Sequence, residues 1–322
     1  MRLIGRIVPD LSLVAVLAIS SVATAQSTRG IQRQVAVTFD DMPGVAMQRS
    51  RQCDARAFAD LNRRLLQSIA RNRIPALALV VESRLCPRLT DSLPGLLNMW
   101  LDAGHELGNH SFSHFDINTT PLARYEADVI RGERVTQVLL RQRGRKLKYF
   151  RHPFLHAGND VKTKEALAKF LAARGYTIAP VTIDNQEWVF AEAYALAKER
   201  RDTTTARRIG EAYLRYMDDI FAFFEKYSVH TVGYEIKQIL LLHVNPLNAD
   251  YLDALARMMR KRGYAFISID QALTDPAYRL RDTYAGPTGL SWLHRWALSK
   301  GMPITTEPRE PEFIRSLSNT SR

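Results

Sequence analysis

The chain has 322 residues, of which 46% are hydrophobic and 24% charged, as in ordinary globular proteins. Its 16 Gly, 14 Pro and 9% aromatic residues exclude collagen-like, low-complexity and disordered proteins. Lys and Arg outnumber Asp and Glu by 45 to 33, and the net charge of +12 indicates an anionic partner. Composition alone leaves this partner open between a nucleic acid and an acidic cell surface.

The N-terminal residues have the layout of a cleaved export signal. Arg2 and Arg6 precede an apolar run at 11–19, and small residues at 23–25 offer a cleavage site. The apolar run is about half of the roughly 20 residues that a membrane-spanning helix needs. We therefore predict a signal peptide at 1–25 and a periplasmic or secreted protein with no transmembrane segment after its removal. The rest of the chain keeps a net charge of +11, because the signal contains two Arg and one Asp.

Short apolar stretches alternate with longer amphipathic ones along the remaining chain, which predicts strands alternating with helices. The predicted strands are 34–39, 76–81, 106–110, 147–151, 176–183, 238–243 and 265–269. The predicted helices are 55–71, 93–103, 122–141, 162–174, 191–227 and 249–262. This regular order favours a parallel sheet with helical crossovers. No G-x-G-x-x-G sequence follows the first strand, which disfavours a dinucleotide-binding open sheet relative to a barrel.

The chain contains two cysteines, Cys53 and Cys86, too few for a scaffold built on disulfides. In an oxidising compartment the two are able to pair. Two buried free thiols fit the sequence equally well, because sequence does not show how closely the two Cα atoms approach.

Ionisable residues follow the predicted strands at the points where these end. The carboxyl ends of parallel strands lie on one side of the sheet, where α/β proteins build their active sites. Taken singly, each residue has an ordinary explanation: Asp40 and Asp41 as a turn or helix cap, and His243 as a hydrogen-bonded core histidine. Eight such residues from five separate segments nevertheless predict one site: Asp40, Asp41, His110, His114, Arg151, Asp184, Glu187 and His243.

In this order the segments resemble the motifs of the polysaccharide deacetylases, the NodB-homology carbohydrate esterases. The matching segments are TFDD at 38–41, HSFSH at 110–114, RHPF at 151–154, DNQEW at 184–188 and LLLH at 240–243. The first three motifs together are highly specific, and the similarity extends over 34–270. It implies an α/β fold of the NodB-homology type, an irregular (β/α) barrel of about seven parallel strands.

The resemblance implies a divalent metal site formed by Asp41, His110 and His114. Two imidazoles and one carboxylate suit Zn²⁺ best, with Co²⁺ or Ni²⁺ as alternatives. The resemblance also assigns Asp40 as the general base that takes a proton from water. Arg151 would keep this carboxylate ionised and oriented.

The remaining motifs imply groups that act on the substrate. His243 would be the general acid for the departing amine, and Phe154 would offer its backbone N–H to the oxyanion. Trp188 would form a wall of the sugar-binding groove. The fourth motif of the family has a second Asp where this chain has Glu187, so either Glu187 or Asp184 is expected to tune His243.

We expect a catalytic domain over 26–275, with a helical insertion at about 190–237, and a C-terminal extension at 276–322 that is packed on the domain or partly disordered. The resulting hypothesis is a secreted metal-dependent polysaccharide N-deacetylase that acts on an acetylated amino-sugar glycan, such as peptidoglycan or chitin, at an anionic cell-envelope surface. The alternatives are the same chemistry on a non-sugar amide or an O-acetyl ester, and a non-catalytic envelope glycan-binding protein. Export and the acidic, histidine-lined site disfavour nucleic-acid binding.

Overall fold

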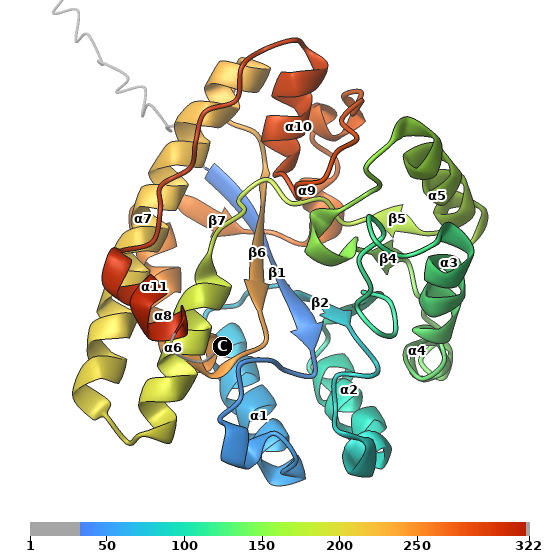
Figure 1. The fold of residues 1–322 in the computed structure, drawn as a ribbon. Helices are drawn as coiled ribbons and strands as arrows, with labels where there is room; N and C mark the ends of the chain where they lie inside the picture. The colour runs from blue at the N-terminus through green and yellow to red at the C-terminus, as the bar shows by residue number, and fades with distance from the viewer. Residues whose placement is uncertain (1–32, 320–322) are drawn as a thin grey trace, which may run out of the picture. The chain divides into compact units, whose positions relative to one another are not determined.

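The computed structural model describes residues 33–319 (Figure 1), and the predicted signal peptide at 1–25 lies outside them. Seven parallel strands follow the order β5-β4-β3-β2-β1-β6, with β7 paired to β1. The strands are β1 (Arg33–Met42), β2 (Leu77–Val80), β3 (Glu106–Asn109), β4 (Tyr149–Phe150), β5 (Thr177–Ile178), β6 (Gln238–His243) and β7 (Tyr264–Phe266). The helices are α1 (Ala55–Arg71), α2 (Leu93–Asp102), α3 (Leu122–Arg131), α4 (Thr136–Arg141), α5 (Val161–Ala173), α6 (Glu187–Glu199), α7 (Thr203–Val232), α8 (Pro246–Lys261), α9 (Ile269–Ala272), α10 (Trp292–Ser299) and α11 (Glu312–Asn319). Within this described part, no helix combines the length and the apolar character that crossing a bilayer requires.

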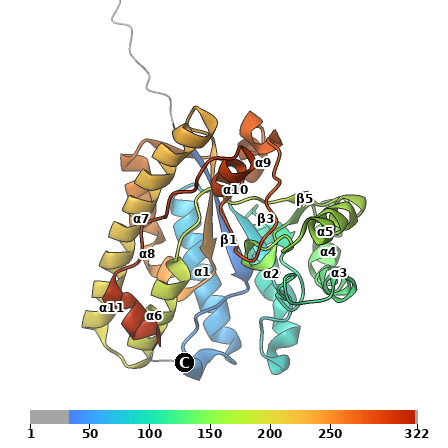
Figure 2. The same ribbon diagram turned by 45° about the horizontal axis from the view of Figure 1, so that its top comes forward.

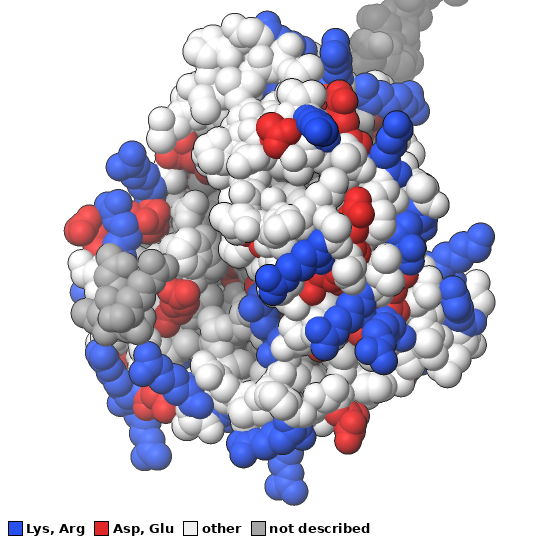
Figure 3. All heavy atoms as spheres, turned by 45° about the vertical axis from the view of Figure 1, so that its right-hand side comes forward, with Lys and Arg blue, Asp and Glu red and all other residues white. Residues whose placement is uncertain are grey.

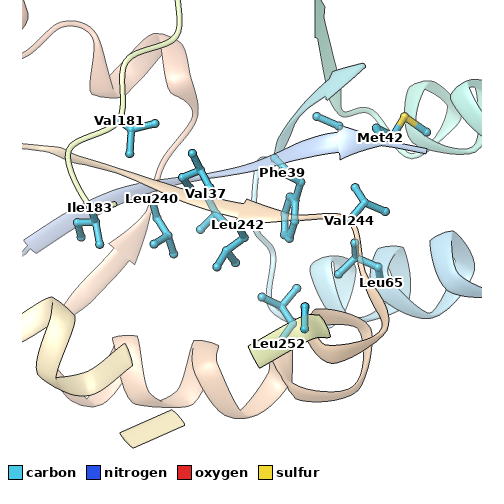
Figure 4. Packing of buried hydrophobic residues seen from close by; sticks show 14 of the residues in the cluster. Val37, Phe39, Met42, Leu65, Val181, Ile183, Leu240, Leu242, Val244 and Leu252 are labelled. Atoms are coloured by element: carbon cyan, nitrogen blue, oxygen red, sulfur yellow. The ribbon is translucent and has the colours of Figure 1, made fainter. Parts of the chain in front are cut away.

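Strand β1 is the centre of the fold, because it pairs with β2, β6 and β7 and its alternate side chains face opposite sides of the sheet. Figure 4 shows the side that packs against α1 and α8, with the buried side chains of Val37, Phe39, Leu240, Leu242, Leu65 and Leu252. On the other side of β1, Ala36 belongs to a smaller apolar cluster inside the barrel. Thr38 and Asp40 follow on that side and form hydrogen bonds with Arg151. The predicted α/β barrel of parallel strands is therefore confirmed.

The segment predicted as one strand at 176–183 pairs with two different strands, β4 at its start and β6 at its end, so the predicted extent of the strand is wrong. Its start pairs with β4 as β5, and Ala179 N–H donates to the Phe150 carbonyl at 2.8 Å. Pro180 has no N–H to donate to a strand partner. Beyond it, Ile183 forms an isolated parallel bridge to Leu240 of β6. This segment thus connects the two edges of the sheet and curves it into an irregular barrel.

The helix predicted at 122–141 is two helices, α3 and α4, separated by a break at Gly132. A Cβ at this glycine would lie 2.7 Å from the carbonyl carbon of Ser111, so the chain passes too closely there for a side chain. The buried Glu82 carboxylate accepts the N–H groups of Val135 and Thr136, at 2.8 and 2.9 Å, at the start of α4. The break thus brings α3 against the loop that carries the histidine motif.

The helical region predicted at 191–227 is also two helices, α6 and α7. Arg201 between them has a φ of 58°, and Asp202 caps α7 by accepting the Thr205 N–H at 2.9 Å. Beyond β7, the C-terminal segment runs over α7, and α11 packs against α6 (Figures 1 and 2). The Trp296 side chain of α10 is 1% exposed, so this segment contributes to the core.

Cys53 and Cys86 form a disulfide, with Cα atoms 5.7 Å apart, which settles the alternatives that the sequence leaves open. The bond joins the loop after β1 to the loop after β2. Both loops lie beside strand ends that carry ionisable residues, so the bond fixes the rim of the candidate site.

Replacing both cysteines with serine is expected to lower the free energy of unfolding by about 2–4 kcal/mol, because the bond closes a loop in the unfolded chain. Urea denaturation without reductant measures this change. Reduction of the wild-type protein serves as the control and should lower its stability by a similar amount, while leaving the double variant unaffected. Equal stabilities of wild type and double variant would contradict the expectation.

Candidate active site

Asp41, His110 and His114 come together at the carboxyl ends of β1 and β3, as their sequence positions predict. One ligand atom from each lies within 4.8 Å of the others, and we refer to these three residues as the three-ligand cluster. Asp41 Oδ1 lies 3.5 Å from His114 Nε2. Two imidazoles and one carboxylate in this arrangement match the donors that zinc and similar divalent ions take in proteins.

The loops of the cluster have an unusual backbone. Asp41, Ser111 and His114 have φ values of 61°, 63° and 55°, in the left-handed region that non-glycine residues seldom adopt. Local hydrogen bonds hold the histidine loop: Asn109 Oδ1 accepts the Ser111 N–H at 2.8 Å, and Ser111 Oγ accepts the His114 N–H at 3.0 Å. Such strained positions persist only where surrounding contacts enforce them, and they concentrate at functional sites.

Low pKa values keep both histidines of the cluster neutral, and a hydrogen bond orients His110. His110 Nδ1–H donates to the Arg151 carbonyl oxygen at 2.8 Å, because a carbonyl only accepts, and this leaves the Nε2 lone pair free for a metal. Burial is the main cause that lowers the pKa of His110. Burial also lowers the pKa of His114 to about 3, against the opposing effect of Asp41. Neutral imidazole is the form that binds metals.

Asp40 lies beside the cluster and forms a buried ion pair with Arg151. Arg151 Nη1 donates to Asp40 Oδ1 at 2.5 Å and to Thr38 Oγ1 at 2.7 Å, and the Arg151 side chain is 0% exposed. Its Nε donates to the Ala179 carbonyl at 3.0 Å. Asp40 Oδ2 lies 3.6 Å from His110 Nε2, on the side of the cluster. One carboxylate oxygen is thus held by Arg151, while the other faces the cluster.

His243 lies across from Asp40 on β6, where the register places the two residues as partners. Its Nδ1 is 2.7 Å from Glu187 Oε2, and Glu187 is 0% exposed. The side-chain amides of Asn245 and Asn248 donate to the other Glu187 oxygen, Asn248 at 2.6 Å. Burial alone would lower the pKa of His243, but Glu187 and the nearby aspartates raise it to about 9.

Glu187, not Asp184, therefore orients His243. Asp184 accepts the N–H of Asn185 at 2.8 Å, and burial raises the pKa of Asp184. Glu307 of the C-terminal segment faces it, and burial together with Asp184 raises the pKa of Glu307. The amides of Asn245 and Asn248 are functional candidates that the sequence reasoning missed. The sequence signal for them is their position: Asn245 and Asn248 follow His243 by two and five residues, at the start of α8.

These side chains open into a cavity of about 930 Å³. It is lined by the three-ligand cluster, by Asp40, Asp184 and His243, and by the aromatic rings of Phe154 and Trp188. Phe154 and Trp188 are 53% and 40% exposed, which is unusual for large apolar side chains and leaves their surfaces available to a ligand. Trp188 belongs to α6, so the helical region after the fourth motif forms one wall of the cavity.

Arg84 is a further residue of the site that the motifs do not include. Its Nη2 donates to Asp41 Oδ1 at 2.5 Å, the same oxygen that faces His114. Arg84 lines the cavity and lies in the loop after β2, which the Ser83 N–H joins to the Phe112 carbonyl at 3.1 Å. Burial would raise the pKa of Asp41, but Arg84 and the histidines hold it well below its usual range. The only sequence signal was its position just beyond the end of a strand.

Fold and site together define the class of this protein. It is a parallel β/α barrel that carries an Asp–His–His cluster beside a buried Asp–Arg pair. Residues 28–193 match the sequence profile of the family described as polysaccharide deacetylase, and the chain belongs to this family. The resemblance inferred from the motifs is thereby confirmed.

Solved structures of low sequence identity are also similar to this chain. The peptidoglycan deacetylase PdaC from Bacillus subtilis is 18% identical, with 76% of this chain and 91% of that chain covered and a TM-score of 0.47. A family 4 carbohydrate esterase from Streptomyces lividans in complex with acetate is 18% identical, with 74% and 95% covered and a TM-score of 0.44. A family 4 pseudoenzyme from Bacillus anthracis is 15% identical, with 76% and 66% covered and a TM-score of 0.46.

Replacing Glu187 with glutamine is expected to lower the pKa of His243 from about 9, because Glu187 is the main group that opposes the effect of burial and only the nearby aspartates then remain. An NMR titration of histidine-labelled, metal-free protein measures this shift. Asp184→Asn is the matched control and should change the pKa of His243 far less. An equal or larger shift in the Asp184 variant would show that Asp184 is the partner instead.

Proposed function

We propose that this protein is a divalent-metal-dependent hydrolase that removes N-acetyl groups from an amino-sugar glycan of the peptidoglycan or chitin kind. Membership of the polysaccharide deacetylase family supports this proposal. The observation that carries it is the placement of Asp40 and His243 on paired strands beside the three-ligand cluster. This arrangement brings a carboxylate, a protonated imidazole and a set of metal donors to one cavity.

The donors of the three-ligand cluster fit a divalent ion, and Zn²⁺ matches them best, with Co²⁺ or Ni²⁺ as alternatives. Such an ion supplies Lewis acidity, which polarises a carbonyl and makes water more acidic. Asp41, His110 and His114 would hold it. The Nδ1–H bond of His110 to the Arg151 carbonyl orients that ligand.

The chain's own groups then divide the proton transfers. Asp40 Oδ2 takes a proton from the attacking water, while Arg151 holds Oδ1 and prevents the carboxylate from turning. The water oxygen bonds to the acetyl carbon, and the Phe154 N–H donates to the oxyanion. His243, protonated through Glu187, gives its proton to the nitrogen as the C–N bond breaks. The products are acetate and a free amine.

Two exposed aromatic rings would bind the sugar. Trp188 and Phe154 line the same cavity, and aromatic faces suit the apolar faces of pyranose rings. The Phe154 ring packs edge-on against His114 with centroids 4.5 Å apart, so a sugar on this ring lies next to the cluster.

We further propose export to the cell envelope. The signal-like residues at 1–25 and the disulfide between Cys53 and Cys86 both agree with an oxidising compartment. Residues 131–148 carry seven Lys and Arg but one acidic residue, Glu133. Figure 3 shows the side of the molecule to which α3 and α4 belong, where basic side chains are spread over the surface with acidic ones among them. Three of the seven, Arg143, Arg145 and Lys148, pair with carboxylates outside this stretch. This surface would hold the enzyme near an anionic polymer.

Asp40→Asn is expected to reduce acetate release from N-acetylglucosamine oligomers and peptidoglycan fragments by about 10²–10⁴-fold, because the general base is lost. The assay uses metal-loaded protein, and Asp60→Asn is the control, because Asp60 is a half-buried carboxylate on α1 that does not line the cavity. Wild-type turnover of small amides or O-acetyl esters, but not of glycans, would favour the alternative substrates. A metal-loaded wild type that binds glycan and releases no acetate would instead identify a non-catalytic glycan-binding protein.

Arg84→Gln is expected to tighten binding of Zn²⁺ by about tenfold, because the ion no longer competes with a charged hydrogen-bond donor on Asp41. Competition with a chelator measures the affinity without any assay of activity. Arg88→Gln, four residues further along the same loop, is the control, since Arg88 bonds to the Cys53 carbonyl instead. Weaker binding in the Arg84 variant would show that Arg84 supports the ligand instead of competing with the metal.

A further inference from the structure

The C-terminal segment at 286–292 lies on the rim of the active-site cavity, beyond the part of the chain that matches the family profile. Three hydrogen bonds fasten it to the segments that follow β4 and β5. Gly286 N–H donates to the Gly158 carbonyl at 3.2 Å, and Trp292 N–H donates to the Val181 carbonyl at 2.7 Å. Ser291 Oγ donates to the Thr182 carbonyl at 3.0 Å. The segment is therefore fixed at both ends.

Between these attachments, Gly289 lies against the backbone of Phe154. A Cβ at position 289 would overlap the Phe154 carbonyl oxygen and would lie 3.0 Å from its carbonyl carbon and 3.2 Å from Leu155 Cβ. The φ of Gly289 lies outside the left-handed region, so the need for glycine comes from space and not from backbone conformation. Gly289 also lines the cavity.

The turn that Gly289 touches has a strained backbone. Phe154 and Leu155 both have a φ of 57°, a conformation that residues with side chains seldom adopt. Gly289 covers the carbonyl group of Phe154. The N–H proposed to bind the oxyanion belongs to the same residue and is joined to this carbonyl through the Phe154 Cα. Moving this carbonyl rotates or displaces the residue, and the direction of the N–H changes with it.

We propose that Gly289 is a positioning residue for the deacetylase reaction, which acts through Phe154. Because it has no side chain, the C-terminal segment closes directly onto the strained turn and fixes the orientation of the oxyanion donor. The inference rests on the proposed function, since it assigns a partner to the Phe154 N–H. It also makes the C-terminal segment a part of the active site.

Gly289→Ala tests this inference, because it adds one carbon at the contact and requires no change in φ. We expect kcat for N-acetylglucosamine oligomers to fall about tenfold to a hundredfold, with KM and Zn²⁺ affinity nearly unchanged. The melting temperature should also fall, because the added carbon displaces backbone. Hydrogen–deuterium exchange should become faster at 152–158. Gly95→Ala is the control, because no heavy atom lies within 4 Å of a Cβ at that position of α2.

An unchanged kcat in Gly289→Ala, or a loss of kcat together with Zn²⁺ affinity, would overturn the inference. If Gly289→Ala does not fold, Ser291→Ala replaces it, because it removes one attachment of the segment, together with the N-cap of α10, without adding an atom. It should lower kcat in the same direction and accelerate exchange at 152–158, and unchanged values of both would overturn the inference. A wild type that releases no acetate would refute the proposed function. In that case, hydrogen–deuterium exchange at 152–158 in the variants still shows whether Gly289 fixes the turn at Phe154.

Discussion

The buried ion pair between Arg151 and Asp40 connects the fold to the site. Moving a charge from water into a protein interior costs several kcal/mol unless the charge is paired and hydrogen-bonded. Arg151 meets this condition by bonding to Asp40 and to the carbonyls of Ala179 and Pro180, where the chain leaves the pairing of β5. Its own carbonyl accepts the Nδ1–H of His110. Arg151, which is buried inside the barrel, thus also orients His110 and the proposed base, Asp40.

The loops around this pair contain residues with strained backbone conformations, which contacts with the rest of the barrel maintain. In the described part of the chain, eight residues other than glycine have positive φ, and five of them line the cavity: Asp41, Ala46, His114, Phe154 and Leu155. Each such position costs on the order of 1 kcal/mol or more. The disulfide between Cys53 and Cys86 and the contact of Gly289 with Phe154 both fasten loops of this rim. Stability elsewhere in the molecule therefore maintains a site geometry that the isolated loops would not hold.

The sequence predicts those parts of the structure that depend on local pattern. Strand and helix positions follow the spacing of apolar residues, and the three-ligand cluster follows from motifs at strand ends. The sequence does not predict features that depend on contacts between segments far apart in the chain. Position 132, between α3 and α4, has no room for a side chain because Ser111 passes close by. A motif search does not reach Arg84 or Gly289, which lie in loops outside the motifs. The choice of Glu187 over Asp184 likewise depends on which side chain the fold brings to His243.

The three-ligand cluster has the donors to hold one divalent ion beside the Asp40–Arg151 pair. Equilibrium dialysis against Zn²⁺ followed by elemental analysis tests it most directly, with wild type and His110→Ala compared at equal protein concentration. We expect one ion per wild-type chain and none per chain of the variant at the same free Zn²⁺ concentration. A wild type that binds no ion, or a folded His110→Ala variant that binds it equally well, would show that these three residues do not form a metal site.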